Sequence, residues 1–215
     1  MSGTPTRPSR EITPPSGGVS DANALVLAEP SHTGGTCPCP REAHDGTAAA
    51  GASLFLRVAF TRAGRDPPRE WVDAAAGVGP DVRVVDATPC PSTDAADGVV
   101  AVAADGPGNL TDLGVRITDA LAELDASGSA ANGEPGPVCC LGSLTVLSQY
   151  VDTREAYRFL NAATSRVSSH GGVAHAHLHP EAHEQRTVDT LTSLFDVVAE
   201  PADDGRGLTV VRSRR

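Results

Sequence analysis

Short apolar runs alternate with amphipathic segments along most of the chain. From Asn23 onward, eight of these runs have the length and composition of β-strands. The predicted strands are Ala24 to Ala28, Ser53 to Phe60, Val82 to Val85, Val99 to Ala103, Val138 to Leu141, Val173 to Leu178, Phe195 to Ala199 and Leu208 to Val211. Several are apolar almost throughout, which is typical of strands covered on both faces.

Helical periodicity separates several of these runs. Asn109 is placed to cap a helix, with Asp112 three residues later, and two more helices are predicted over 156–167 and 188–194. The first helix is marked by apolar residues on one face, namely Leu110, Leu113, Ile117, Leu121 and Leu124. Strands that alternate with helices imply βαβ crossovers. We therefore predict an α/β fold, a three-layer sandwich with a largely parallel central sheet flanked by helices.

The pattern fits one domain preceded by a tail. Residues 1–21 carry too little apolar surface to offset the entropy of ordering them, so they are predicted to be disordered. Residues 22–215 then form the α/β domain. Two stretches rich in small residues, 33–51 and 126–137, are predicted to be flexible connections within it.

Charge narrows the choice of partners. The net charge is -10, from 27 acidic and 17 basic residues, and every basic residue is arginine because the chain contains no lysine. An acidic surface repels phosphates, so nucleic acid is not the expected partner. The acidity, with only 3% aromatic residues, is similar to that of cytoplasmic proteins of salt-loving archaea. A bacterial genome of high GC content would also favour arginine over lysine.

The sequence predicts a cytoplasmic protein with no membrane segment. No apolar run approaches the roughly 18 residues that a bilayer requires, and the first residues lack an apolar signal region. The five cysteines are Cys37, Cys39, Cys90, Cys139 and Cys140. An odd number in such a chain favours free thiols over a disulfide framework.

The segment after the first predicted strand has part of the spacing of a phosphate-binding loop. Gly34 and Thr36 fit the frame of the motif G-x-x-x-x-G-K-[ST]. However, Glu29 replaces the first glycine and Gly35 replaces the lysine that would reach the phosphates. The residues Gly34, Gly35 and Thr36 are therefore either a vestigial nucleotide-binding loop or an ordinary glycine-rich turn, and the turn is favoured.

The segment Val138 to Glu200 carries a more specific pattern. It reads VCCLGSLTVLSQYVDTREAYRFLNAATSRVSSHGGVAHAHLHPEAHEQRTVDTLTSLFDVVAE and resembles the second half of RecA/KaiC-like domains of the P-loop ATPase superfamily. It is similar in particular to a haloarchaeal family of such domains whose Walker motifs are degenerate. In that family an apolar strand ends in Asp-Ser-Leu, and Gly142, Ser143 and Leu144 occupy this position here. The resemblance implies a RecA/KaiC-like fold over about residues 23 to 200, with the metal-binding aspartate of Walker B replaced by Gly142.

Histidines offer a second kind of candidate chemistry. His175, His177 and His179 alternate along one predicted strand and so share a face, and His183 follows. Imidazoles in this pattern could bind Zn²⁺ or Ni²⁺ if cysteine or carboxylate groups completed the shell. Structural histidines are favoured, because helices on both sides of a central strand leave little room before its carboxyl end. Cys37, Cys39 and His44 lack the usual ligand spacing.

Three hypotheses for function follow. The first is a non-catalytic RecA/KaiC-like protein, or pseudo-ATPase, that acts in regulation or signalling through a protein partner or a homo-oligomer and uses no cofactor. The second is an atypical ATP-binding protein or ATPase that uses arginine and the Gly34 to Thr36 turn. The third is a metal-binding sensor built on the histidines. The replaced lysine and aspartate positions favour the first and argue against an enzyme.

Overall fold

The computed structural model describes residues 23–27, 52–67, 69–75, 81–127, 136–201 and 208–214. All predicted strands and helices are present, with most ends shifted by a few residues. Its elements are β1 (Ala24–Leu27), β2 (Leu54–Ala59), η3 (Arg62–Gly64), α2 (Arg69–Ala75), β3 (Asp81–Asp86), β4 (Val99–Ala103), α3 (Leu110–Ser127), β5 (Val138–Ser143), α4 (Leu144–Leu147), α5 (Thr153–Ser169), β6 (Val173–Leu178), η5 (Pro180–Ala182), α6 (Gln185–Thr192), β7 (Val197–Pro201) and β8 (Leu208–Ser213).

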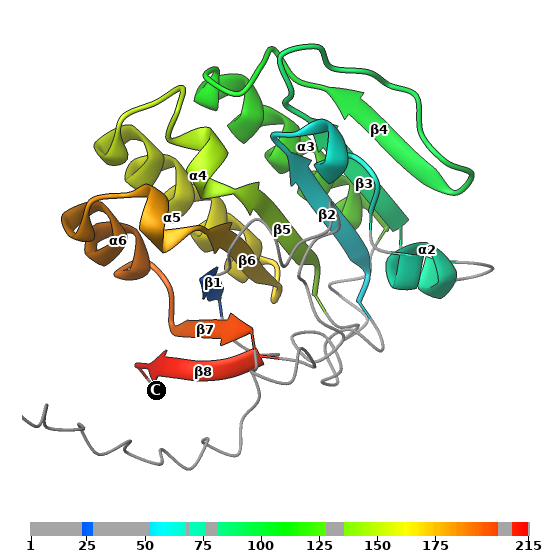
Figure 1. Cartoon of the computed structure of the whole chain (residues 1–215). Coiled ribbons are helices and arrows are strands. Elements are labelled where there is room, and N and C mark those ends of the chain that lie inside the picture. The colour runs from blue at the N-terminus through cyan, green and yellow to red at the C-terminus, as the bar shows by residue number, and fades with distance from the viewer. Residues whose placement is uncertain are drawn as a thin grey trace, which may run out of the picture.

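The strands form one eight-stranded sheet in the order β4-β3-β2-β5-β6-β1-β7-β8. Every neighbouring pair is parallel except β7 and β8, which are antiparallel. Figure 1 shows this sheet running from β4 at one edge to β8 at the other. The predicted α/β sandwich with a largely parallel central sheet is confirmed. The predicted tail 1–21 lies outside the described residues, as do residues 28–51.

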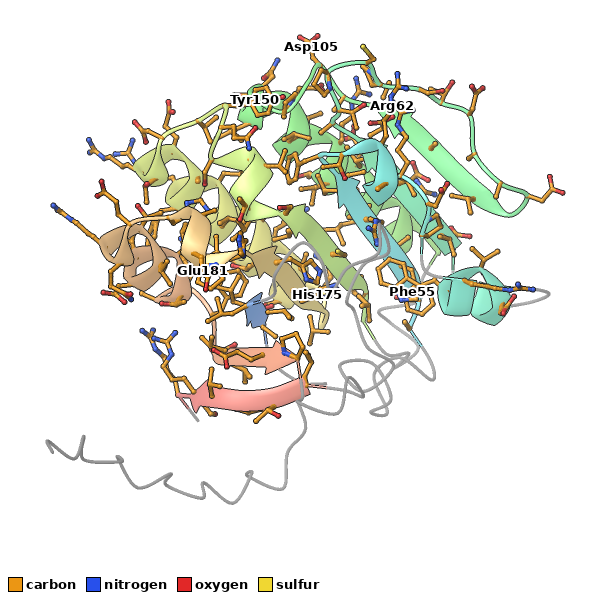
Figure 2. All side chains as sticks on the ribbon, viewed as in Figure 1. Phe55, Arg62, Asp105, Tyr150, His175 and Glu181 are labelled. Atoms are coloured by element: carbon orange, nitrogen blue, oxygen red, sulfur yellow. The ribbon has the colours of Figure 1, made fainter. Side chains whose placement is uncertain are left out.

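One face of the sheet packs against α2. The ring of Trp71 on α2 stacks on Phe55 of β2, with ring centroids 4.9 Å apart and an interplanar angle of 10°. Val138 and Cys140 of β5 belong to the same buried cluster. Phe55 points to this side of the sheet, near α2 (Figure 2). The cluster is small, and α2 was not predicted because its apolar positions span only two turns.

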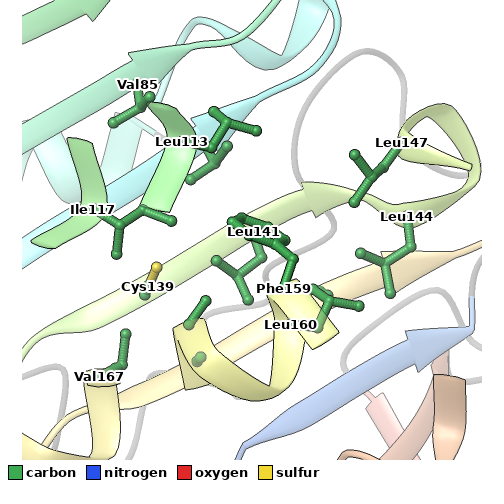
Figure 3. Close-up of a cluster of buried hydrophobic side chains, with 14 of the residues drawn as sticks. Val85, Leu113, Ile117, Cys139, Leu141, Leu144, Leu147, Phe159, Leu160 and Val167 are labelled. Atoms are coloured by element: carbon green, nitrogen blue, oxygen red, sulfur yellow. The ribbon is translucent and has the colours of Figure 1, made fainter. Parts of the chain in front are cut away.

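The opposite face carries the main hydrophobic core, which packs against α3, α4, α5 and α6. Figure 3 shows Leu113 and Ile117 of α3, and Phe159 and Leu160 of α5, flanking β5 on this same face of the sheet. The helix starts are fixed by caps: the side chain of Asn109 accepts a hydrogen bond from the backbone N–H of Asp112 at 3.1 Å, as predicted. This face therefore provides most of the apolar burial that holds the sheet.

The connections leave the middle of the sheet in opposite directions. From β2 the chain passes through α2 to β3, which lies toward the β4 edge of the sheet. From its neighbour β5 the chain passes through α5 to β6, which lies toward the β8 edge, and α5 covers the face opposite to α2. In open α/β sheets such a reversal produces a crevice outside the carboxyl ends of the two strands, where ligands bind. The ends of β2 and β5 are therefore the first place to look for a site.

The helices in the described ranges are all too short or too polar to cross a lipid bilayer.

Candidate functional site

Gly142 lies at the carboxyl end of β5, beside the end of β2. Its φ of +65° is in the left-handed region that favours glycine. A β carbon built on Gly142 would collide with the carbonyl oxygen of Val58 and lie 2.9 Å from Cδ2 of Phe60. The ring of Phe60 is itself buried. A side chain at position 142 would thus collide with the end of β2 and with Phe60, at the position where the resemblance implied a metal-binding carboxylate.

The hydroxyl of Ser143 caps a helix. Its oxygen accepts a hydrogen bond from the backbone N–H of Val146 at 3.3 Å, at the start of the short helix α4. The side chain of Thr145 on that helix bonds the next strand end, accepting from the backbone N–H of His179 at 2.9 Å. Gly142 and Ser143 therefore shape the turn between β5 and α4.

A buried ion pair organises the next strand end along the sheet. The carboxylate of Asp86, 1% exposed, lies 2.6 Å from Nε of Arg65. It also accepts hydrogen bonds from the backbone N–H groups of Thr88 at 2.9 Å and Ser92 at 2.8 Å. The guanidinium of Arg65 in turn donates to the hydroxyl of Thr88 and to the carbonyl of Cys90. One carboxylate thus fixes the loop after β3 against the loop after β2.

A cavity of about 300 Å³ lies between these two loops over β3 and β4. Its polar lining residues are Arg62, Arg65, Asp66, Asp86, Ser92 and Asp94. Charges of both signs line it, and the Arg65 and Asp86 charges are already paired with each other. The hydroxyl of Ser92 in this lining accepts a hydrogen bond from the backbone N–H of Asp94 at 3.0 Å.

The face of the sheet that packs on α2 holds a cluster of one thiol and two imidazoles. Cys140 of β5 and His175 and His177 of β6 are all buried, and one potential ligand atom from each lies within 4.8 Å of the others. Sγ of Cys140 is 3.6 Å from Nε2 of His177. The rings of His175 and His177 meet edge to face, with centroids 5.3 Å apart. Figure 2 shows His175 within the sheet, well away from Arg62.

The structure brings two of the four candidate histidines together. His175 and His177 lie with Cys140 in mid-strand, where Cys140 of β5 is opposite His175 of β6. The third, His179, follows the end of β6 and lies at the start of η5. The fourth, His183, contacts the hydroxyl of Thr145 through Nε2 at 3.1 Å. The sequence pattern therefore predicted the shared face of the first two but not the partner Cys140.

Burial and charge act in opposite directions on Cys140. Burial raises the pKa of its thiol, and the positive charge of Arg57 and a hydrogen bond from the backbone of Gly142 lower it. Arg57 is opposite Cys140 in the register of β2 and β5, and its side chain is buried. Its Nε donates to the carbonyl of Gly64, while its Nη1 has no hydrogen-bond partner among the described residues. A buried cation therefore lies beside this cluster.

The other sequence candidates lie outside the described residues. These are Gly34, Gly35 and Thr36 of the predicted turn, together with Cys37, Cys39 and His44. β1, which precedes the turn, lies between β6 and β7, and its last residue, Leu27, is opposite Leu178. The Asp86 and Arg65 pair was missed by the sequence reasoning, although an aspartate directly after an apolar run was a visible signal.

The sequence profile of a family of unknown function, DUF7504, matches residues 22–201. The chain belongs to this family. The match covers the whole sheet up to β7 and all of the helices described above. No curated protein matches the chain.

Among solved structures, the fold is similar to that of a Pyrococcus horikoshii OT3 protein studied under the project identifier PH0250. The identity is 12% and the TM-score 0.52, with 91% of this chain and 88% of that chain covered. The cytoplasmic domain of EssC has 14% identity and a TM-score of 0.43, with 90% and 34% covered. EssC (ATPases 2 and 3) from Geobacillus thermodenitrificans has 14% and 0.42, with 91% and 32% covered. The chain spans about a third of the length of the two EssC structures. Of these three structures, the Pyrococcus horikoshii protein is the one whose likeness bears on the fold.

Proposed function

We propose that the chain is a pseudo-ATPase: a RecA/KaiC-like domain that does not hydrolyse nucleotide and acts in the cytoplasm through protein contacts, in regulation or signalling. The observation that carries the proposal is the conformation of Gly142. Its left-handed φ and its contact with Val58 and Phe60 leave no room for a side chain at the position where the family resemblance implies the metal-binding aspartate. Without that carboxylate, a hydrated Mg²⁺ has no anchor at the end of β5.

The composition supports the same proposal. Phosphoryl transfer depends on positioned cations that stabilise the charge spreading over the transferred group. The chain contains no lysine, so no lysine of the same subunit reaches the phosphates. Loss of both groups removes two contributions that are each worth orders of magnitude in rate.

An atypical ATP-binding protein or ATPase is the alternative. Titration calorimetry with ATP and Mg²⁺ measures whether ATP binds, and phosphate release measures whether it is hydrolysed. We expect no phosphate release above the uncatalysed background, whether or not ATP binds at the Gly34 to Thr36 turn. A parallel phosphate-release assay on the wild-type chain and on Thr36→Ala gives the decision. Turnover that the wild type supports and Thr36→Ala abolishes would falsify the pseudo-ATPase proposal.

Protein contacts are supported by the edge strand β4. This strand lies at one edge of the sheet and pairs only with β3 among the described residues. Its sequence is VVAVA. Val100 on this strand is 51% exposed. A short apolar edge strand without charges offers backbone groups and apolar side chains to another chain, since natural sheets usually protect such edges with charge.

A charge placed on this edge tests the contact. We expect the wild-type chain to self-associate in sedimentation or to capture a partner in pull-downs from the native host, and Val100→Arg to abolish this. Val115→Arg is the matched control, because Val115 is 49% exposed but lies on α3. Equal association by both variants and the wild type places the contact surface elsewhere and contradicts the role of β4.

A further inference from the structure

We propose that Cys140, His175 and His177 form a Zn²⁺ site on the face of the sheet that packs against α2. The site is separate from the nucleotide position at the end of β5 and does not depend on the proposed function. Three side chains of the types that bind zinc are buried side by side, with one potential ligand atom from each within 4.8 Å of the others.

One of the three distances already matches the separation that a metal ion requires. Zinc binds sulfur at about 2.3 Å and imidazole nitrogen at about 2.0 Å, so two such ligands in a tetrahedral arrangement lie about 3.5 Å apart. Sγ of Cys140 and Nε2 of His177 are 3.6 Å apart. The rings of His175 and His177 are in edge-to-face contact, with centroids 5.3 Å apart. The ligand atom of His175 completes a group in which all three atoms lie within 4.8 Å of one another, so binding one ion requires it to move closer.

A β-bulge in β5 helps to place the three residues together. Cys140 is opposite His175, but after the bulge Ser143, and not the expected Gly142, is opposite His177. Two residues of β5, Leu141 and Gly142, therefore face one residue of β6. Bulges of this kind bend a strand and redirect its side chains. Cys140 is thereby held near both imidazoles, which are two residues apart on the neighbouring strand.

The donor set selects the metal. One thiolate and two imidazoles suit zinc and related transition metals, whereas Mg²⁺ and Ca²⁺ require oxygen ligands. Three protein ligands leave a fourth position for water or an anion. The charge of Arg57, which is opposite Cys140 on β2, weakens the binding of any dication. We therefore expect weaker binding than at closed structural sites with four protein ligands.

The experiment uses the full-length chain purified without a histidine tag. Its metal content is measured by mass spectrometry after dialysis against Zn²⁺ and then against metal-free buffer. We expect about one zinc ion per chain. Co²⁺ then replaces zinc as a spectroscopic probe, and we expect a thiolate-to-cobalt charge-transfer band with the intense visible bands of a tetrahedral site.

Two cysteine variants assign the thiolate. Cys140→Ala removes the proposed ligand, and Cys139→Ala is the matched control because Cys139 is equally buried on the same strand but belongs to the core on the opposite face. We expect Cys140→Ala to lose the charge-transfer band and to weaken Co²⁺ binding by at least about tenfold to a hundredfold, the loss seen when even outer partners of a metal site are removed. Cys139→Ala should keep both.

Three results would overturn the proposal. They are wild-type protein that retains no zinc, a cobalt spectrum without the charge-transfer band, and a band that Cys140→Ala retains in full. The last result would assign the thiolate to another cysteine. The first two need only the wild-type chain, so the proposal remains testable even if a variant does not fold. Zn²⁺ should also raise the thermal midpoint of the wild type, since a ligand that binds only the folded state stabilises it.

Discussion

The Gly142→Ala substitution should lower the free energy of unfolding by about 3 kcal/mol. Part of this loss comes from the left-handed backbone, which costs a residue with a β carbon roughly 1–2 kcal/mol. The rest comes from the collision with the carbonyl oxygen of Val58 and the contact with Phe60, because overpacking costs typically 1–3 kcal/mol. Urea unfolding followed by circular dichroism, with the m-value checked for constancy, measures the change.

Gly98→Ala separates these two contributions. Gly98 also has a positive φ, of +80°, but a β carbon there would meet nothing within 4 Å. Its substitution should therefore cost only the backbone contribution, about 1 kcal/mol. If both variants lose the same stability, the close approach of β2 to β5 at Gly142 is not the cause, and the argument that the site excludes a carboxylate fails with it. Gly142→Asp should likewise destabilise the chain without producing ATP hydrolysis.

Asp86→Ala should destabilise the chain by about 3 kcal/mol. Removing one partner of a buried ion pair costs about 3–5 kcal/mol because the other partner and its donors lose their acceptor. Here Asp86 serves Arg65 and two backbone N–H groups, from Thr88 and Ser92. The lower end of the range applies because the side chain of Arg65 is 25% exposed and can turn toward water. Denaturant unfolding measures the loss.

An ion pair whose carboxylate is exposed provides the control for Asp86. Arg83 pairs with Glu123, whose side chain is 61% exposed, and this pair raises the pKa of Arg83 and lowers that of Glu123. Glu123→Ala should nevertheless leave the unfolding midpoint almost unchanged, because solvent screens such pairs and both side chains lose entropy on forming them. If Glu123→Ala lowered the free energy of unfolding as much as Asp86→Ala, the burial of the Asp86 carboxylate would not explain its contribution to stability.

The fold could be predicted because its information is local. The apolar run of β6 and the spaced leucines of α3 each specify an element from neighbouring residues, and their alternation specifies a parallel sheet. The element α2 escaped prediction because its seven residues are too few for a clear period. β5 also extends beyond its predicted end at Leu141, to Ser143. A strand that continues through a glycine with positive φ has no distinctive sequence pattern.

The candidate sites were harder to predict because they depend on pairing between distant segments. The alternation of His175 and His177 predicted that they share a face, but nothing near them indicates that β5, 35 residues earlier at Cys140, is their neighbour. The bulge that positions Cys140 involves both strands. In the same way, the lack of room for a side chain at Gly142 depends on Phe60, which directly follows β2 and is more than 80 residues away in the sequence.

The stacking of Trp71 on Phe55 has a practical consequence. Trp71 is the single tryptophan of the chain and only 3% exposed, so intrinsic fluorescence excited at the indole reports on one place in the molecule. That place is the buried cluster that also contains Cys140. The chain therefore carries its own optical reporter of this face, and its emission should follow the loosening of α2 without any attached label.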